Sequence, residues 1–158
     1  MNKQALVIGY GSPLRGDDGL GWEVAGRLAA CIADQSVSIM PVQQLTPELS
    51  EPIHQAALVI FVDASSEGEP GTWRCTEVSS VSTSSSPLGH HMDVTALMAY
   101  TQAVYKTSPT ALLVSVTAET FACHDHLSDK VEAALPAVVR YIREKMTSLN
   151  PDRKQTYA

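Results

Sequence analysis

Two adjacent carboxylates, Asp17 and Asp18, stand in the glycine-rich segment "ALVIGYGSPLRGDDGLG", residues 5–21. A glycine-rich turn between a strand and a helix usually binds phosphate through backbone N–H groups. Two negative charges at that place would repel a phosphate and attract a cation. The pair therefore indicates either a cation site or a helix N-cap, a role that needs only one aspartate.

The nucleotide-binding patterns do not fit this segment. Gly9 and Gly11 match the start of the dinucleotide fingerprint G-x-G-x-x-G, but Leu14 occupies the third glycine position. The phosphate-binding P-loop also fails, because no Lys-Ser or Lys-Thr pair closes the loop. A nucleotide-dependent α/β enzyme remains the weaker hypothesis, which saturable dinucleotide binding with thermal protection would revive.

Two other segments carry side chains that could share such a cation. Asp63 ends the apolar run "ALVIFVD", and His90 and His91 lie in "PLGHHMDV". Alone, the aspartate reads as a turn residue and each histidine as a surface residue. Together, carboxylates and an imidazole favour Ni²⁺, Zn²⁺ or Fe²⁺ over Mg²⁺ and Ca²⁺.

The apolar patterns predict strands that alternate with helices. We expect strands at 5–8, 37–42, 57–63, 72–77 and 111–116. We expect one helix that begins near residue 17, and three more at 46–55, 93–105 and 128–148. Such alternation predicts an α/β sandwich with a mostly parallel sheet. Since the carboxyl ends of parallel strands meet at one edge, Asp63 should emerge beside the glycine-rich segment, where ligands bind in these sheets.

The helix that follows the glycine-rich segment should begin at Asp17 or Asp18, either of which can N-cap it. Its apolar positions follow helical spacing and are Leu20, Val24, Leu28, Cys31 and Ile32. The last helix has a similar face, formed by Val131, Leu135, Val138, Val139 and Ile142. We assign residues 1–150 to a single α/β domain and residues 151–158 to a polar C-terminal tail.

The composition indicates which binding partners and which cellular compartment to expect. The chain of 158 residues is 44% hydrophobic and has a net charge of −6, which argues against nucleic acid and against anionic membranes. No apolar run approaches the roughly 18 residues of a membrane span. Three isolated cysteines, Cys31, Cys75 and Cys123, suggest a reducing compartment, so we expect a cytoplasmic protein.

Common hydrolase signatures are missing from the sequence. There is no G-x-S-x-G nucleophile elbow and no H-E-x-x-H zinc helix. The run "CHDH", residues 123–126, offers a thiol, imidazoles and a carboxylate, but no second cluster accompanies it. We interpret it as a polar loop before the last helix, which Asp125 or Ser128 would cap; a metal site or a cysteine nucleophile there is the weaker alternative.

Four segments together resemble the hydrogenase maturation endopeptidases, which process the large subunit of nickel–iron hydrogenases. "VIGYGSPLRGDDGLG" resembles the family's opening motif G-x-G-N-x-x-x-x-D-[DE]-x-x-G, with Ser12 in place of the usual Asn. "FVDASSEGEPGTWR" is similar to its V-D-A…G-x-x-P-G-x-x-R segment. "GHHMDVTALMAY" resembles its histidine segment, and "LSDKVEAALPAVVRYI" its last helix. The resemblance spans nearly the whole chain in order.

This resemblance implies a single-domain three-layer sandwich, with helices on both faces of a twisted, mostly parallel five-stranded sheet. By position, it implies a metal-binding and catalytic trio of Asp18, Asp63 and His90, with His91 as the near alternative. It also implies removal of a C-terminal peptide from a nickel-loaded precursor of the large subunit. The nickel would come with that substrate and complete an open site on the enzyme, which we expect to be monomeric.

Two points stay open at this stage. The metal could dock the scissile bond, or it could act as a Lewis acid while Asp18 or Asp63 serves as general base. The same trio would also suit a nickel-recognising assembly chaperone that binds the precursor without cutting it. Loss of a peptide on incubation with nickel-loaded precursor separates the enzyme from the chaperone.

Overall fold

A computed structural model describes residues 3–79 and 92–149 of the chain. Its strands are β1 (Lys3–Tyr10), β2 (Val37–Val42), β3 (Ala56–Ser65), β4 (Trp73–Glu77) and β5 (Thr110–Thr117). Its helices are α1 (Leu20–Cys31), α2 (Ser50–His54), α3 (Val94–Tyr105) and α4 (Asp129–Ser148), with short 3-10 turns η1 (Gly16–Gly19) and η2 (Pro47–Leu49). His90, His91 and the tail 151–158 lie outside the described residues.

The strands form one five-stranded sheet in the order β2-β1-β3-β5-β4. All neighbouring pairs are parallel except β4, which runs antiparallel to β5. The predicted strands all exist, and the predicted mostly parallel sheet is confirmed. Most strands extend one or more residues beyond their apolar runs because polar residues at the ends, such as Lys3 and Ser65, continue the pairing.

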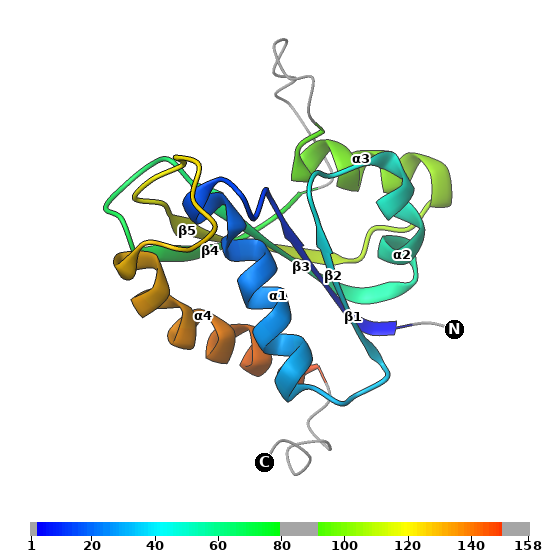
Figure 1. Cartoon of the computed structure of the whole chain (residues 1–158). Coiled ribbons are helices and arrows are strands. Elements are labelled where there is room, and N and C mark those ends of the chain that lie inside the picture. Colours follow the sequence, from blue (N-terminus) through cyan, green and yellow to red (C-terminus); the bar gives the residue numbers. More distant parts are fainter. Residues whose placement is uncertain (1–2, 80–91, 150–158) are drawn as a thin grey trace.

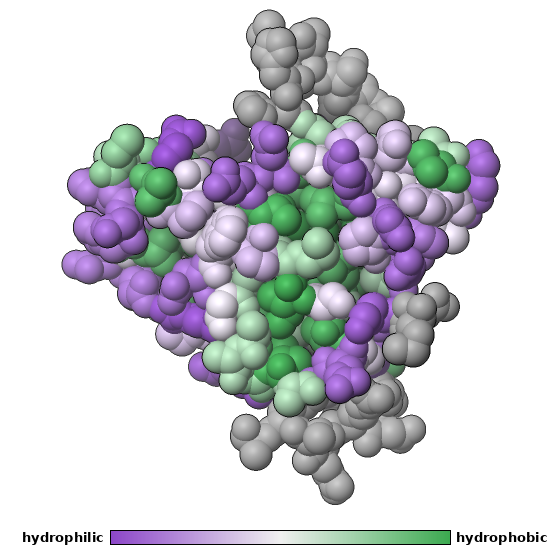
Figure 2. Space-filling view, turned by 45° about the vertical axis from the view of Figure 1, so that its right-hand side comes forward, coloured by the Kyte–Doolittle hydropathy of each residue, from purple (hydrophilic) through white to green (hydrophobic). Residues whose placement is uncertain are grey.

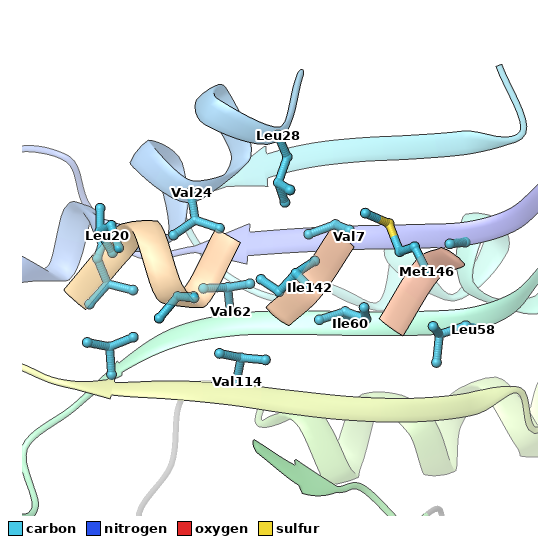
Figure 3. Close-up of a cluster of buried hydrophobic side chains, with 14 of the residues drawn as sticks. Val7, Leu20, Val24, Leu28, Leu58, Ile60, Val62, Val114, Ile142 and Met146 are labelled. Carbon is cyan, nitrogen blue, oxygen red and sulfur yellow. The ribbon is translucent and has the colours of Figure 1, made fainter. Parts of the chain in front are cut away.

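Helices cover both faces of this sheet, as Figure 1 shows. On one face α1 and α4 pack against the sheet, and Figure 3 shows this core, with Val7, Ile60 and Val114 of the strands beneath α1 and α4. On the other face α2 and α3 enclose a second core around Ile8, Phe61 and others. Burial of the strands on both faces explains why β1 and β3 are continuous apolar runs rather than alternating ones.

The predicted faces and caps are partly right. In α4 the predicted apolar positions all face the core, with Val139 only half-buried, and the Ser128 side chain caps the helix by accepting a hydrogen bond from the Val131 amide. In α1 the prediction for Cys31 is wrong, because its side chain is exposed at the last turn. The predicted cap of α1 by Asp17 or Asp18 is also wrong: η1 intervenes, and α1 begins after Gly19.

The surface is mostly hydrophilic but not uniformly so. Figure 2 shows a strip of hydrophobic surface down the middle of one face, with hydrophilic residues on both sides. The edge strand β2 contains the exposed Pro41, and proline at a sheet edge discourages pairing with another strand. None of the helices in residues 3–79 and 92–149 combines the length and apolarity that crossing a membrane requires.

Candidate active site

The site lies where β1 and β3, neighbours in the centre of the sheet, both reach their carboxyl ends. The last paired residues there are Gly9 of β1 and Val62 of β3, so Tyr10 and Asp63 follow side by side. Side chains alternate along a strand, and Ile8 and Phe61 belong to the α2–α3 core. Tyr10 and Asp63 therefore emerge on the α2–α3 side of the sheet.

Asp63 is held in a partly desolvated position. Its Oδ1 atom accepts a hydrogen bond of 2.7 Å from the Ala64 amide. Burial, with a smaller contribution from the negative charge of Asp18, raises the pKa of Asp63 to about 6, although the Ala64 amide and the neighbouring Tyr10 hydroxyl oppose this rise. A carboxyl group with that pKa can exchange a proton near neutral pH, as a general base must.

Asp18, in η1, lies at the same edge of the sheet as Asp63 and lines the same cavity. Its Oδ2 atom accepts a hydrogen bond of 2.7 Å from the Ser12 amide. Because this donor is a main-chain group, the bond does not depend on whether residue 12 is serine, as here, or asparagine, as in the motif that the segment resembles. Gly11 has a φ of 136°, and a Cβ atom there would lie 2.1 Å from the Asp18 carbonyl oxygen, so only glycine permits this close approach.

Asp17 points to the opposite side of η1 and is fully buried. Its carboxylate accepts four hydrogen bonds, from the amides of Glu119, Thr120 and Ser128 and from the Ser128 hydroxyl, at 2.7–3.2 Å. Burial alone would raise the pKa of Asp17, but these bonds outweigh it and lower the pKa below its usual value. Asp17 thus ties η1 to the segment before α4 instead of capping its own helix.

Asp18 and Asp63 line one cavity of about 450 Å³ at this edge of the sheet. Its walls come from the end of β1, the glycine-rich segment, the residues after β2 and the residue before the α3 cap; they are Tyr10, Gly11, Ser12, Arg15, Gln43, Gln44, Leu45 and Met92. The structure therefore brings two of the three predicted site residues together. The third, His90, and its alternative His91 lie outside the described residues.

The CHDH segment does not form a competing centre. Cys123, His124 and His126 are exposed, and the two imidazole rings are 5.3 Å apart between centroids. Across residues 3–79 and 92–149, no three His, Cys, Asp or Glu side chains are placed to hold a metal ion together. A second cavity, of about 310 Å³, adjoins Asp125 and His126 on the other side of the glycine-rich segment.

Several residues of the cavity were not singled out by the sequence. Gln43, Gln44 and Leu45 follow β2, and their position after a third parallel strand was the available signal, since ligands bind at the carboxyl ends of such strands. Tyr10 was overlooked because its neighbour in the cavity, Asp63, is on another strand. Only the register of β1 against β3 shows that it neighbours Asp63.

No known family model matches the chain, and no curated protein does. Solved structures do match over more than nine-tenths of it. The hydrogenase maturating endopeptidase HybD from E. coli has a TM-score of 0.80 at 21% identity, covering 93% of this chain and 94% of its own. The [NiFe] hydrogenase maturation protease HycI from Thermococcus kodakarensis has a TM-score of 0.77 at 20% identity, covering 92% and 93%.

A third similar structure is the hydrogenase 2 maturation peptidase from a Thaumarchaeota archaeon, with a TM-score of 0.69 at 22% identity, covering 91% of this chain and 98% of its own. This is the fold of the hydrogenase maturation endopeptidases. The predicted three-layer fold is thereby confirmed. At these identities the match concerns the fold, and the chemistry has to be argued from the site.

Proposed function

We propose that this protein is an endopeptidase that removes the C-terminal peptide from the nickel-loaded precursor of a nickel–iron hydrogenase large subunit. One observation carries the proposal: Asp18 and Asp63, from separate segments, line one cavity at the carboxyl edge of the sheet. Its support is that the chain has the fold of proteins named as hydrogenase maturation endopeptidases. Asp18, Asp63 and His90 are the proposed metal-binding and catalytic residues.

The third ligand is proposed from the resemblance. His90 and His91 precede Met92, which lines the cavity, by two and one residues in the sequence. We propose His90 as the ligand and retain His91 as the alternative.

The nickel belongs to the substrate in this proposal. Two carboxylates and one imidazole leave coordination positions open on a metal such as Ni²⁺, and thiolates of the precursor would fill them. A precursor without nickel would lack this anchor and stay uncut. Either Asp18 or Asp63 would serve as the general base that accepts a proton from an attacking water.

The test is an incubation of the purified protein with nickel-loaded and metal-free precursor, followed by mass spectrometry of the products. We expect the nickel-loaded precursor to lose a C-terminal peptide and the metal-free one to stay intact. Asp18→Ala, Asp63→Ala and His90→Ala should abolish the cut while the fold persists. Asp125→Ala and His124→Ala, at exposed positions, are the matched controls and should cut normally.

The same assay separates the enzyme from a chaperone. A stable complex with uncut nickel-loaded precursor would contradict the peptidase and favour a nickel-recognising assembly protein. We further propose that the protein acts as a monomer in the cytoplasm. Its three cysteines are free, which suits a reducing compartment.

A further inference from the structure

Arg15 brings a positive charge to the wall of the candidate cavity. Among the described residues that line this cavity, the charged ones are Arg15, Asp18 and Asp63. Arg15 lies in the glycine-rich segment, three residues before Asp18, and its side chain is exposed. Because the residue both lines the cavity and meets solvent, its charge lies at the opening of a cavity whose inner charges are negative.

Hydrogen bonds hold the main chain on both sides of Arg15. Its amide donates to the Ser12 carbonyl oxygen over 3.2 Å, and its own carbonyl oxygen accepts from the Asp18 amide over 3.1 Å. The Gly16 amide, which follows, donates to the His124 carbonyl oxygen over 2.9 Å. The side chain of Arg15 therefore starts from a fixed point close to Asp18.

The guanidinium group of Arg15 makes no ion pair with another described residue. By contrast, the guanidinium group of Arg27, on α1, pairs with both Glu23 and Glu132. A guanidinium group carries five N–H donors and no acceptor. In Arg15 these donors and the charge are thus left for a ligand of the cavity.

The substrate in the proposed function brings negative charge to this place. Each thiolate that holds nickel carries one negative charge, so a pair of thiolates cancels the charge of Ni²⁺. The carboxylates of Asp18 and Asp63 attract free Ni²⁺, but they gain no such attraction from a nickel centre that its thiolates have neutralised. Recognition of thiolate-bound nickel therefore calls for a positive group that free Ni²⁺ does not need.

We propose that Arg15 is a specificity-determining residue: its guanidinium group donates hydrogen bonds to the thiolates that hold the nickel of the precursor, and so favours thiolate-bound nickel over free Ni²⁺. The inference rests on the proposed function, which supplies the nickel-loaded precursor. Arginine suits this task because its donors form a planar fork that is always charged and only weakly hydrated. One substitution should then have opposite effects on the binding of the two ligands.

The test is Arg15→Gln, which removes the charge and keeps a polar side chain. In the processing assay KM for the nickel-loaded precursor should rise by roughly 10-fold because hydrogen bonds from a charged donor are lost, while kcat stays within about threefold. Titration calorimetry of the full chain with NiCl2 should show a Kd lowered by about two- to threefold, because a charge that repels Ni²⁺ is gone. Arg15→Lys keeps the charge without the fork and should raise KM by only about threefold.

Arg140→Gln is the matched control. Arg140 is an exposed arginine of α4, so its substitution changes the net charge by the same amount away from the residues that line the cavity. It should change neither KM nor the nickel Kd. An unchanged KM in Arg15→Gln would overturn the proposal. A nickel Kd raised more than about twofold in that variant would also overturn it, because Arg15 would then support the metal site itself.

Binding measurements separate this proposal from the proposed function. If the wild type binds nickel-loaded precursor without cutting it, the proposed function fails. Calorimetry with that precursor then replaces KM, and Arg15→Gln should raise its Kd by roughly the same 10-fold. If the wild type cuts the precursor and Arg15→Gln cuts it with the same KM, the role of Arg15 fails and the proposed function stands. A wild type that binds no precursor would contradict both.

Discussion

The side chains of the adjacent residues Asp17 and Asp18 leave the turn η1 in different directions and have different partners. On the inner side Asp17 is fully buried and accepts four hydrogen bonds from residues 119–128. On the outer side Asp18 accepts a hydrogen bond from the Ser12 amide and lines a cavity with Asp63. Identical side chains one position apart thus serve stability and the candidate site, respectively.

The difference lies in how many partners each carboxylate has. The lone pairs of a buried carboxylate must accept hydrogen bonds from the protein, and those of Asp17 accept four. A carboxylate that is to bind a metal must keep lone pairs free, and within the described part of the chain the Asp18 carboxylate accepts a single hydrogen bond. The comparison predicts that substitutions on the two sides of η1 fail in different ways.

The largest effect should come from the outer side. Asp18→Asn keeps the shape and the Ser12 bond but removes the charge, and we expect processing of the nickel-loaded precursor to fall by at least about 100-fold. The melting temperature should stay within about 2 °C, because the side chain is only partly buried. Normal processing by this variant would show that the two aspartates do not divide the roles in this way.

The next effect belongs to the inner side and appears in stability. Asp17→Ala leaves three partly buried amides and a hydroxyl group without their acceptor, and the free energy of unfolding should fall by about 2–4 kcal/mol. Urea titration measures this, and processing per folded molecule should remain within about threefold. An equal loss of stability in Asp18→Ala would remove the contrast between the two sides.

Substitution of Asp63 should have a smaller effect on the free energy of unfolding, and one of opposite sign. Its pKa is raised from 3.8 to about 6, so between these values the folded protein holds a proton that the unfolded chain has released. Its contribution to stability therefore falls as pH rises through this window, and the loss persists above it. Asp63→Asn should raise the free energy of unfolding by about 1–3 kcal/mol at pH 7.5 and by much less at pH 4.

Urea titrations of wild type and Asp63→Asn at both pH values measure that difference. A variant that is no more stable than wild type at pH 7.5 would show that the carboxylate is not destabilised by its surroundings. Since the same variant should lose processing, a gain in stability with a loss of activity would mark Asp63 as a functional residue.

The smallest effect tests the interpretation of the CHDH segment. Cys123 is exposed and free, so Cys123→Ser should change stability by less than about 0.5 kcal/mol and leave processing unchanged. A thiol-alkylating reagent should likewise leave processing unaffected. Inactivation by either would revive the alternative of a cysteine nucleophile.

Local patterns in the sequence predicted the elements well. Continuous apolar runs located β1 and β3 because both strands are buried on two faces, and spacing located the core face of α4. The cap of α4 at Ser128 was also readable, since its partner, the amide of Val131, lies three residues away.

Contacts between distant segments could not be predicted in the same way. Asp17 looked like a local cap, but its partners are more than 100 residues further along the chain. The position of Tyr10 beside Asp63 depends on the register of two strands, which the residues of β1 alone do not determine. The shared edge of Asp18 and Asp63 was predictable because parallel strands end on the same side, and that rule needs only the order of elements.

The central claim is that Asp18 and Asp63 bind one ion together with a histidine that precedes Met92. Crystals soaked in a nickel salt and measured at the nickel absorption edge test this most directly. We predict an anomalous peak between the two carboxylates, with an imidazole as a third ligand. A peak at the CHDH segment instead, or none near Asp18 and Asp63 in crystals that contain nickel elsewhere, would contradict the account.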